Sequence, residues 1–251
     1  MQEAQCGDHS NQKIYCEAQS IMSFEEINEY YSEWWENPKD IRNVVFESLN
    51  KLIQDRIPTG EGKRALDIGS GHGKIVSYLV EKGYDVTAVD LNEAFCEELK
   101  KKFPSVRVLR GDIRSMYFNE DEKFDLTTCI ELVQNLERHE LVQLVAKLST
   151  ITRELLINIS NSNSLHARWV RLRGWQKSFV YAYTPRDFER VLNDASFDVT
   201  YTKGVGLLTP ISLFKDFKIK LLPNWLINTV NRFDPYFGSL CHLYYIEATR
   251  R

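Results

Sequence analysis

The amino-acid sequence predicts a doubly wound α/β fold with one mostly parallel, seven-stranded sheet. Seven short apolar runs follow one another from Arg64 onward, and amphipathic helical stretches separate the early ones. A strand–helix–strand repeat of this kind forms right-handed crossovers and therefore parallel strand pairs. A further observation is the stretch ALDIGSGHGKIV (65–76), which has three glycines within five residues directly behind the first run. At 251 residues the chain is short enough for one main core.

The expected strands, in chain order, are ALDIG (65–69), DVTAVDL (85–91), SVRVLRGD (105–112), FDLTTCIEL (124–132), ELLINIS (154–160), FDVTYTKGV (197–205) and HLYYIEATR (242–250). Helices are expected over IVSYLVEK (75–82), EAFCEELKKKF (93–103) and HELVQLVAKL (139–148). A long irregular segment without a strong terminal helix separates the last two runs. This break in the repeat predicts an antiparallel last strand and an antiparallel edge of the sheet.

The segments outside this repeat are expected to form a loose leader and a small cap. Residues 1–20 are polar and aperiodic, which is typical of a leader, so 21–251 is predicted to be a single domain. Asn37 and Pro38 end one expected helix and begin the next. The cap segments are 21–57, 160–183 and 207–240, of which the last two exceed the connection lengths that the sheet needs.

Composition and charge exclude several classes of protein. The net charge of −3 provides no overall basic field for nucleic acid. The five cysteines are odd in number, widely spread and without a Cys-x-x-Cys pair, which favours a reduced, cytoplasmic setting over a disulfide framework or a zinc site. The N-terminus lacks the pattern of a signal peptide, and no apolar run approaches the ~18 residues of a membrane span. We therefore expect a soluble protein.

The spacing of the glycines excludes two common phosphate-binding loops. A dinucleotide fingerprint counted from Gly69 would require glycine at position 74, where Lys74 stands. A Walker loop would require serine or threonine after that lysine, and Ile75 follows it. The pattern that remains is Asp67-x-Gly69-x-Gly71-x-Gly73.

This pattern resembles motif I of the class I S-adenosylmethionine-dependent methyltransferases, and the resemblance continues through the next strands. VTAVDL ends with Asp90 and Leu91, and Asp90 matches the acid with which the family grips both ribose hydroxyls. LRGDIRSM carries Asp112, which in the family accepts the adenine amino group, with Ile113 beside the ring. The run CIELVQNLE (129–137) resembles the strand-four motif of the quinone-biosynthesis-like branch, commonly Cys-x-Glu-Val-Leu-Glu-His-Val.

The resemblance implies S-adenosylmethionine as cofactor and a set of residues that contact it. Helices before motif I commonly close over the cofactor in this family, which adds Tyr31 and Trp35, although an aromatic stripe is more often a packed helix face. The predicted contacts are Asp67, Gly69, Ser70, Gly71, Gly73, Asp90, Leu91, Asp112, Ile113, Ile130, Glu131, Tyr31 and Trp35. Gln134 and Asn135 replace the family's usual Glu-His pair and are poorer ligands, so we expect no metal.

A general base is needed only if the acceptor is a protonated hydroxyl. The candidates for a catalytic base are His139, which opens a predicted helix after strand four, and His166, which lies in a cap segment. Both are equally compatible with a surface histidine. Glu131 is a third candidate, for which holding the cofactor or the strand-four turn is the better interpretation.

The acceptor is expected to be a small molecule. In HARWVRLRGWQK (166–177) cations alternate with tryptophans, which fits an anion clamp, a contact with a membrane surface or a solvated basic face. The mixture of cations and large apolar residues in 213–233 favours an apolar, lipid-linked or natural-product acceptor and peripheral membrane contact. The Asn/Asp-Pro-Pro-Tyr loop and the Pro-Cys nucleophile of related nucleic-acid enzymes are missing, so we expect no nucleic acid.

The leading functional hypothesis is methyl transfer to oxygen or nitrogen of that acceptor, with oxygen preferred. The alternative is a catalytically silent partner subunit that binds the cofactor without turnover, for which the change at Gln134 and Asn135 leaves room. The oligomeric state stays open.

Overall fold

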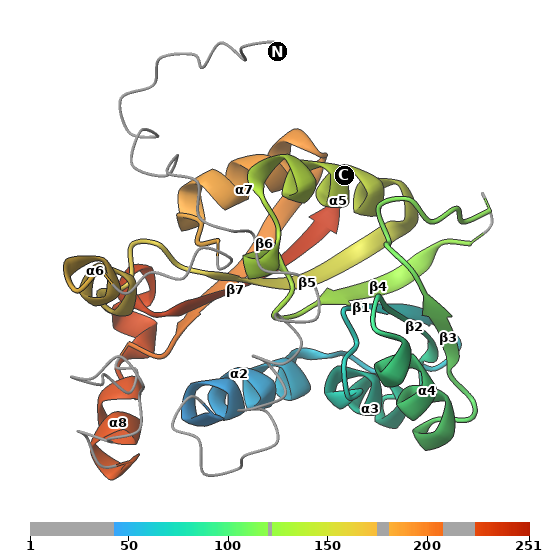
Figure 1. Ribbon diagram of the computed structural model, residues 1–251, viewed down its shortest axis with the longest axis horizontal. Coiled ribbons are helices and arrows are strands. Elements are labelled where there is room, and N and C mark those ends of the chain that lie inside the picture. Colours follow the sequence, from blue (N-terminus) through green and yellow to red (C-terminus); the bar gives the residue numbers. More distant parts are fainter. Residues whose placement is uncertain (1–42, 120–121, 175–180, 208–223) are drawn as a thin grey trace.

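The fold is a seven-stranded sheet between two layers of helices (Figure 1). A computed structural model of the chain describes residues 43–119, 122–174, 181–207 and 224–251. The strands are β1 (Arg64–Ile68), β2 (Asp85–Asp90), β3 (Arg107–Arg110), β4 (Phe124–Cys129), β5 (Thr152–Ser160), β6 (Phe197–Val205) and β7 (Leu243–Arg250). Their order in the sheet is β3-β2-β1-β4-β5-β7-β6.

The strand directions confirm the predicted doubly wound topology. The pairs β2–β3, β1–β2, β1–β4 and β4–β5 are parallel, whereas β7 is antiparallel to both β5 and β6. The predicted antiparallel last strand is therefore confirmed. β7 lies inside the sheet, between β5 and β6, so the strand at this edge is β6.

The helices cover both faces of the sheet and bury its apolar side chains. On one face lie α2 (Asn43–Arg56), α3 (Lys74–Glu81) and α4 (Glu93–Lys102), and on the other α5 (Arg138–Ile151) and α7 (Pro185–Asp194) (Figure 1). Leu49, Leu79 and Leu99 are fully buried on the first face, and Leu144 and Phe188 on the second. Removing these side chains from water is the main contribution that holds both layers on the sheet.

The remaining helices belong to the predicted cap segments. The described part of segment 21–57 contains α2, which contacts α3 and β6. Segment 160–183 contains α6 (Leu165–Leu172), and segment 207–240 contains α8 (Asn224–Asn231) with the 3-10 turns η2 (Asp234–Tyr236) and η3 (Gly238–Leu240). The predicted leader and the helix boundary at Asn37 and Pro38 lie outside the described residues. Among the helices that are described, none is both long and apolar enough to cross a membrane.

Candidate functional site

The glycine loop connects β1 to α3 at the carboxyl end of the sheet. Gly69, Gly71 and Gly73 all have positive φ angles, of 71°, 47° and 78°, which side-chain-bearing residues rarely adopt. A Cβ atom on Gly73 would lie 2.4 Å from Leu99 Cδ2, so packing between α3 and α4 explains this glycine. A Cβ atom on Gly71 would meet none of the described residues within 4 Å. Packing among the described residues therefore does not require Gly71, although its positive φ favours glycine, and the open backbone here fits a cradle for a ligand.

Asp67, at the base of the loop, is buried with 2% of its surface exposed. Its Oδ1 atom accepts a hydrogen bond from Thr128 Oγ1 at 2.6 Å, and its main-chain oxygen accepts one from Ser70 Oγ at 2.9 Å. Burial raises the pKa of Asp67 to about 6. Its Oδ2 atom has no hydrogen-bond partner among the described residues, and a functional role is one explanation for a buried unsatisfied oxygen.

Asp90 ends β2 and is joined directly to the glycine loop. Its Oδ2 atom accepts a hydrogen bond from Gly71 N at 2.9 Å, and its Oδ1 atom accepts one from Asn92 N at 2.8 Å. Burial raises the pKa of Asp90, while these two backbone donors oppose the shift. Each carboxylate oxygen has a further lone pair, so Asp90 can still accept two hydrogen bonds from a diol. The adjacent Leu91 exposes 46% of its surface, an apolar patch beside the acid.

Asp112 lies next to Asp90 because Gly111 N donates a hydrogen bond to Asp90 O at 3.0 Å. Its carboxylate is already engaged by Arg114, whose Nη2 atom lies 2.6 Å from Asp112 Oδ2. Hydrogen bonds from Arg114 lower the pKa of Asp112. Ile113 is 5% exposed and packs in the core below this turn. Sequence reasoning missed Arg114, because a charged residue in a loop has no pattern that reveals its partner.

Glu131 follows β4 with a φ of 59°, a strained value for a residue with a side chain. Its backbone N–H donates to Asn158 Oδ1 at 2.7 Å, and Asn158 Nδ2 donates to Glu131 Oε1. Gln134 Nε2 donates to Glu131 Oε2 at 3.0 Å. Burial raises the pKa of Glu131 to about 7. Ile130, directly before it, is 9% exposed.

The side-chain amides of Gln134 and Asn158 contact Glu131, and sequence reasoning interpreted both residues incompletely. Gln134 is buried and orients the carboxylate, whereas the sequence marked it only as a lost metal ligand. Asn158 is fully buried within the apolar run of β5, and a polar residue in such a run was the signal that could have identified it. In the described part of the chain no three His, Cys, Asp or Glu residues form a group that could hold a metal ion.

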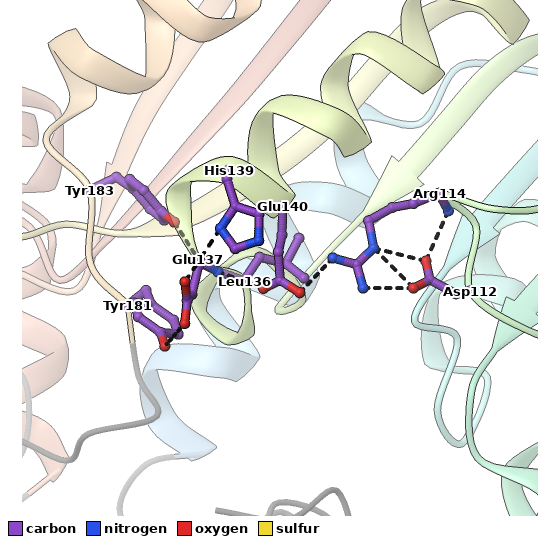
Figure 2. Close-up of polar contacts among 8 residues, drawn as sticks. All are labelled: Asp112, Arg114, Leu136, Glu137, His139, Glu140, Tyr181 and Tyr183. Carbon is purple, nitrogen blue, oxygen red and sulfur yellow. Dashed lines mark hydrogen bonds and ion pairs between the residues drawn. The ribbon is translucent and has the colours of Figure 1, made fainter. Parts of the chain in front are cut away.

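The two candidate histidines have different surroundings. His139 is exposed near the start of α5, with Nδ1 3.3 Å from Glu137 Oε2 (Figure 2). His166 lies on α6, and its ring centroid is 4.4 Å from that of His242. Burial lowers the pKa of His166 to about 4, so this imidazole is neutral near pH 7. His242 was missed because nothing in the sequence indicates that the start of β7 lies beside α6.

Some predicted residues of the cap make contacts with other residues of the chain, and others lie outside the described part. On α6, Arg171 Nη2 donates to Ser162 O at 3.0 Å, and the Arg173 guanidinium lies 4.5 Å from the centre of the Trp169 ring. The predictions for Tyr31 and Trp35 concern residues that the structure does not describe, as do those for Trp175 and Lys177.

The sheet order, the glycine loop and the acids that follow it support the predicted resemblance to the class I S-adenosylmethionine-dependent methyltransferases. Residues 65–154 match the family model described as a methyltransferase domain. Among solved structures, the magnesium protoporphyrin IX methyltransferase from Synechocystis PCC 6803 with bound SAH has a TM-score of 0.60 at 16% identity, covering 96% of this chain and 92% of that one.

Curated relatives support the resemblance to the quinone-biosynthesis branch. A putative methyltransferase of Invertebrate iridescent virus 6 is 25% identical over 197 residues, which cover 75% of this chain and 70% of the viral protein. The mitochondrial ubiquinone biosynthesis O-methyltransferase of Schizosaccharomyces pombe is 27% identical over 161 residues, 56% of this chain. The match spans 58% of that enzyme, and 51% of its counterpart from Nitrosospira multiformis, so the chain spans little more than half the length of these quinone enzymes.

Proposed function

We propose that this protein transfers the methyl group of S-adenosylmethionine to an oxygen or nitrogen atom of a small-molecule acceptor, with oxygen preferred. One observation carries the proposal. The Asp90 carboxylate accepts a hydrogen bond from the backbone N–H of Gly71, at the open part of the glycine loop. This contact fixes a carboxylate that suits two ribose hydroxyls beside the backbone of Gly71, which carries no side chain. The preference for oxygen comes from the ubiquinone O-methyltransferases among the relatives.

The proposed cofactor contacts divide by position along the sheet edge. The backbone of Gly69, Ser70, Gly71 and Gly73 would lie against the amino acid and ribose portions, with Asp67 bracing the loop. Asp90 and Leu91 would contact the ribose, and Asp112 and Ile113 the adenine. Ile130 and Glu131 would contact the cofactor from the end of β4. The cofactor supplies a methyl group activated by its sulfonium. The protein therefore mainly positions the acceptor and excludes water.

We keep Glu131 as a brace of the turn after β4, because Asn158 and Gln134 already engage both of its carboxylate oxygens. For a hydroxyl acceptor the candidate bases are the two histidines. His139 exposes 68% of its side chain and is paired with Glu137. His166 remains an alternative base that is neutral at pH 7.

The proposed acceptor class includes lipid-linked compounds and natural products, with peripheral contact to a membrane surface. Exposed apolar side chains on and after α8 support this part of the proposal, since Trp225 exposes 68% of its surface and Phe233 52%. Nucleic acid is not proposed as the acceptor. The ribosomal RNA methyltransferase relative from Geobacter sulfurreducens is 36% identical, but only over 76 residues that cover 28% of that enzyme.

Calorimetry with S-adenosylmethionine and S-adenosylhomocysteine tests the cofactor half of the proposal. Gly71→Ala is expected to weaken binding at least 10-fold, because a methyl group would occupy the open backbone. Gly62→Ala is the matched control, since Gly62 also has a positive φ, of 71°, and no described residue lies within 4 Å of its missing Cβ. Both variants should lose about 1 kcal/mol of stability from the strained φ, while Gly62→Ala should bind like wild type. Failure of the wild-type protein to bind either ligand rejects the proposal.

Turnover separates the enzyme from a silent partner subunit. The protein is incubated with labelled cofactor and a panel of hydroxyl and amine acceptors, and release of S-adenosylhomocysteine is measured. Product formation that depends on acceptor supports the enzyme. Tight cofactor binding without product from any acceptor class favours the silent alternative.

A further inference from the structure

Arg114 joins two carboxylates that come from different parts of the fold. It follows β3 by four residues, and its guanidinium lies between Asp112 and Glu140 at the start of α5 (Figure 2). Nη1 lies 2.6 Å from Glu140 Oε1, and Nη2 lies 2.6 Å from Asp112 Oδ2. The side chains of Arg114, Asp112 and Glu140 are 25%, 30% and 26% exposed. This partial shielding makes the bridge stronger than an ordinary surface ion pair.

Glu140 is itself fixed by the helix that carries it. Its Oε2 atom accepts a hydrogen bond from Glu137 N at 2.8 Å, which completes the capping box of α5. The oxygen that binds Arg114 is therefore held by a helix end rather than by a free surface side chain. Through Arg114, the turn after β3 is tied to the first turn of α5.

The contacts of Arg114 determine which hydrogen bonds Asp112 can still accept. Asp112 Oδ1 accepts bonds from the backbone N and from Nε of Arg114, at 2.9 and 3.0 Å. Oδ2 accepts from Nη2, and Nε is shared with it at 3.0 Å. A carboxylate offers about four lone-pair sites. Nε lies 3.0 Å from both oxygens and counts only once, so the described donors occupy three sites and leave one on the carboxylate.

We propose that Arg114 is a positioning residue for adenine recognition, which holds the Asp112 carboxylate so that its one remaining lone pair receives the exocyclic amino group. This inference rests on the proposed function and names a determinant of specificity within the same site. A purine with an oxo group at that position would place an oxygen against the fixed carboxylate, and the two acceptors would repel each other. Arg114 thereby makes the site select an aminopurine over an oxopurine.

The test compares the affinities of S-adenosylhomocysteine and S-inosylhomocysteine, in which an oxo group replaces the amino group. Wild-type protein should bind the adenosyl compound more tightly by about 10-fold or more, the value of a charge-assisted hydrogen bond. Arg114→Met should weaken adenosyl binding by about 10-fold and change inosyl binding little, so that the preference falls towards 1. Arg114→Lys, which keeps the charge, should restore part of the preference.

Two further variants separate positioning from general stabilisation. Glu140→Gln keeps a capping-box side chain but removes the charge that holds Arg114, so it should reduce the preference less than Arg114→Met. Arg107→Met removes a different arginine, which stands at the start of β3 and pairs with Glu122. This variant should leave the preference at the wild-type value.

An equal loss of both affinities in Arg114→Met would mean that Arg114 only stabilises the fold, and would overturn the inference. An unchanged preference in that variant would overturn it as well. Neither outcome affects the proposed function, because the wild-type protein would still bind S-adenosylhomocysteine. Absence of binding by the wild-type protein would reject the proposed function together with this inference.

Discussion

Ionisation of the buried Glu131 carboxylate destabilises the folded protein, so this residue makes the free energy of unfolding depend on pH. Burial raises its pKa from an ordinary value of 4.5 to about 7, so between these values the folded protein binds more protons than the unfolded chain. The free energy of unfolding should therefore decrease as the pH rises through this window. For Glu131→Gln, which cannot titrate, this contribution is absent. Relative to that variant, the free energy of unfolding of the wild-type protein should fall by on the order of 3 kcal/mol between pH 4.5 and pH 8.

Urea unfolding of both proteins at the two pH values measures this difference. Glu47→Gln removes a carboxylate from the exposed side of α2 and controls for the loss of a surface charge. The prediction would be contradicted if the free energies of unfolding of wild type and Glu131→Gln differed by the same amount at both pH values.

At the scale of residues, the sequence predicted the types of group in the site but not their partners. Asp90 and Gly71 were identified from spacing, and the structure joins them by a hydrogen bond. Arg114 and Glu140 are 26 positions apart in loops and helix starts, where side-chain patterns have no period, so their contact follows only from the fold. The predicted roles of the cofactor contacts and of the histidines stay predictions.

At the scale of elements, the start of α7 depends on one threonine. Thr184 Oγ1 accepts a hydrogen bond from Asp187 N at 3.1 Å and donates one to Asp187 Oδ2 at 2.7 Å, and Pro185 begins the helix. Thr184→Ala should lower the free energy of unfolding by about 1 kcal/mol, because it removes a helix cap. Thr184→Ser keeps the hydroxyl and should retain most of the stability.

Chemical denaturation measures both Thr184 variants, and calorimetry with S-adenosylhomocysteine checks that the site is intact. α7 packs on the edge strand β6, which β4, β5 and β7 separate from β1 and its glycine loop, so the affinity should not change. A loss of affinity in Thr184→Ala without a loss of stability would argue against a purely local capping role.

The elements that were predicted best are those whose sequence pattern extends over the whole element. All seven strands and the helices after β1, β2 and β4 occur where apolar periodicity indicated them. The insertion of β7 between β5 and β6 could not be predicted in the same way, because strand order depends on contacts between distant segments. Apolar runs identify strands but do not identify their neighbours.

At the scale of the whole molecule, two helix layers share one sheet, which predicts a single cooperative unit. The core on one face includes Leu79 of α3, and that on the other includes Leu144 of α5; both side chains are fully buried. Because the strands between them contribute side chains to both faces, neither layer can lose its packing without exposing the sheet. The prediction of one domain over 21–251 therefore implies that the two helix layers unfold together.

Leu79→Ala and Leu144→Ala should each lower the free energy of unfolding by about 2–5 kcal/mol, the usual cost of a cavity in a packed core. Their effects should add to within about 0.5 kcal/mol in the double variant, since the two sites lie on opposite faces of the sheet. Val142→Ala, at a position on α5 that is 46% exposed, is the control and should change stability by less than about 1 kcal/mol. Urea unfolding followed by far-UV circular dichroism and by tryptophan fluorescence should give one coincident transition in every variant. Two separate transitions, with each leucine affecting only one of them, would show that the layers unfold independently and that the chain is not a single domain.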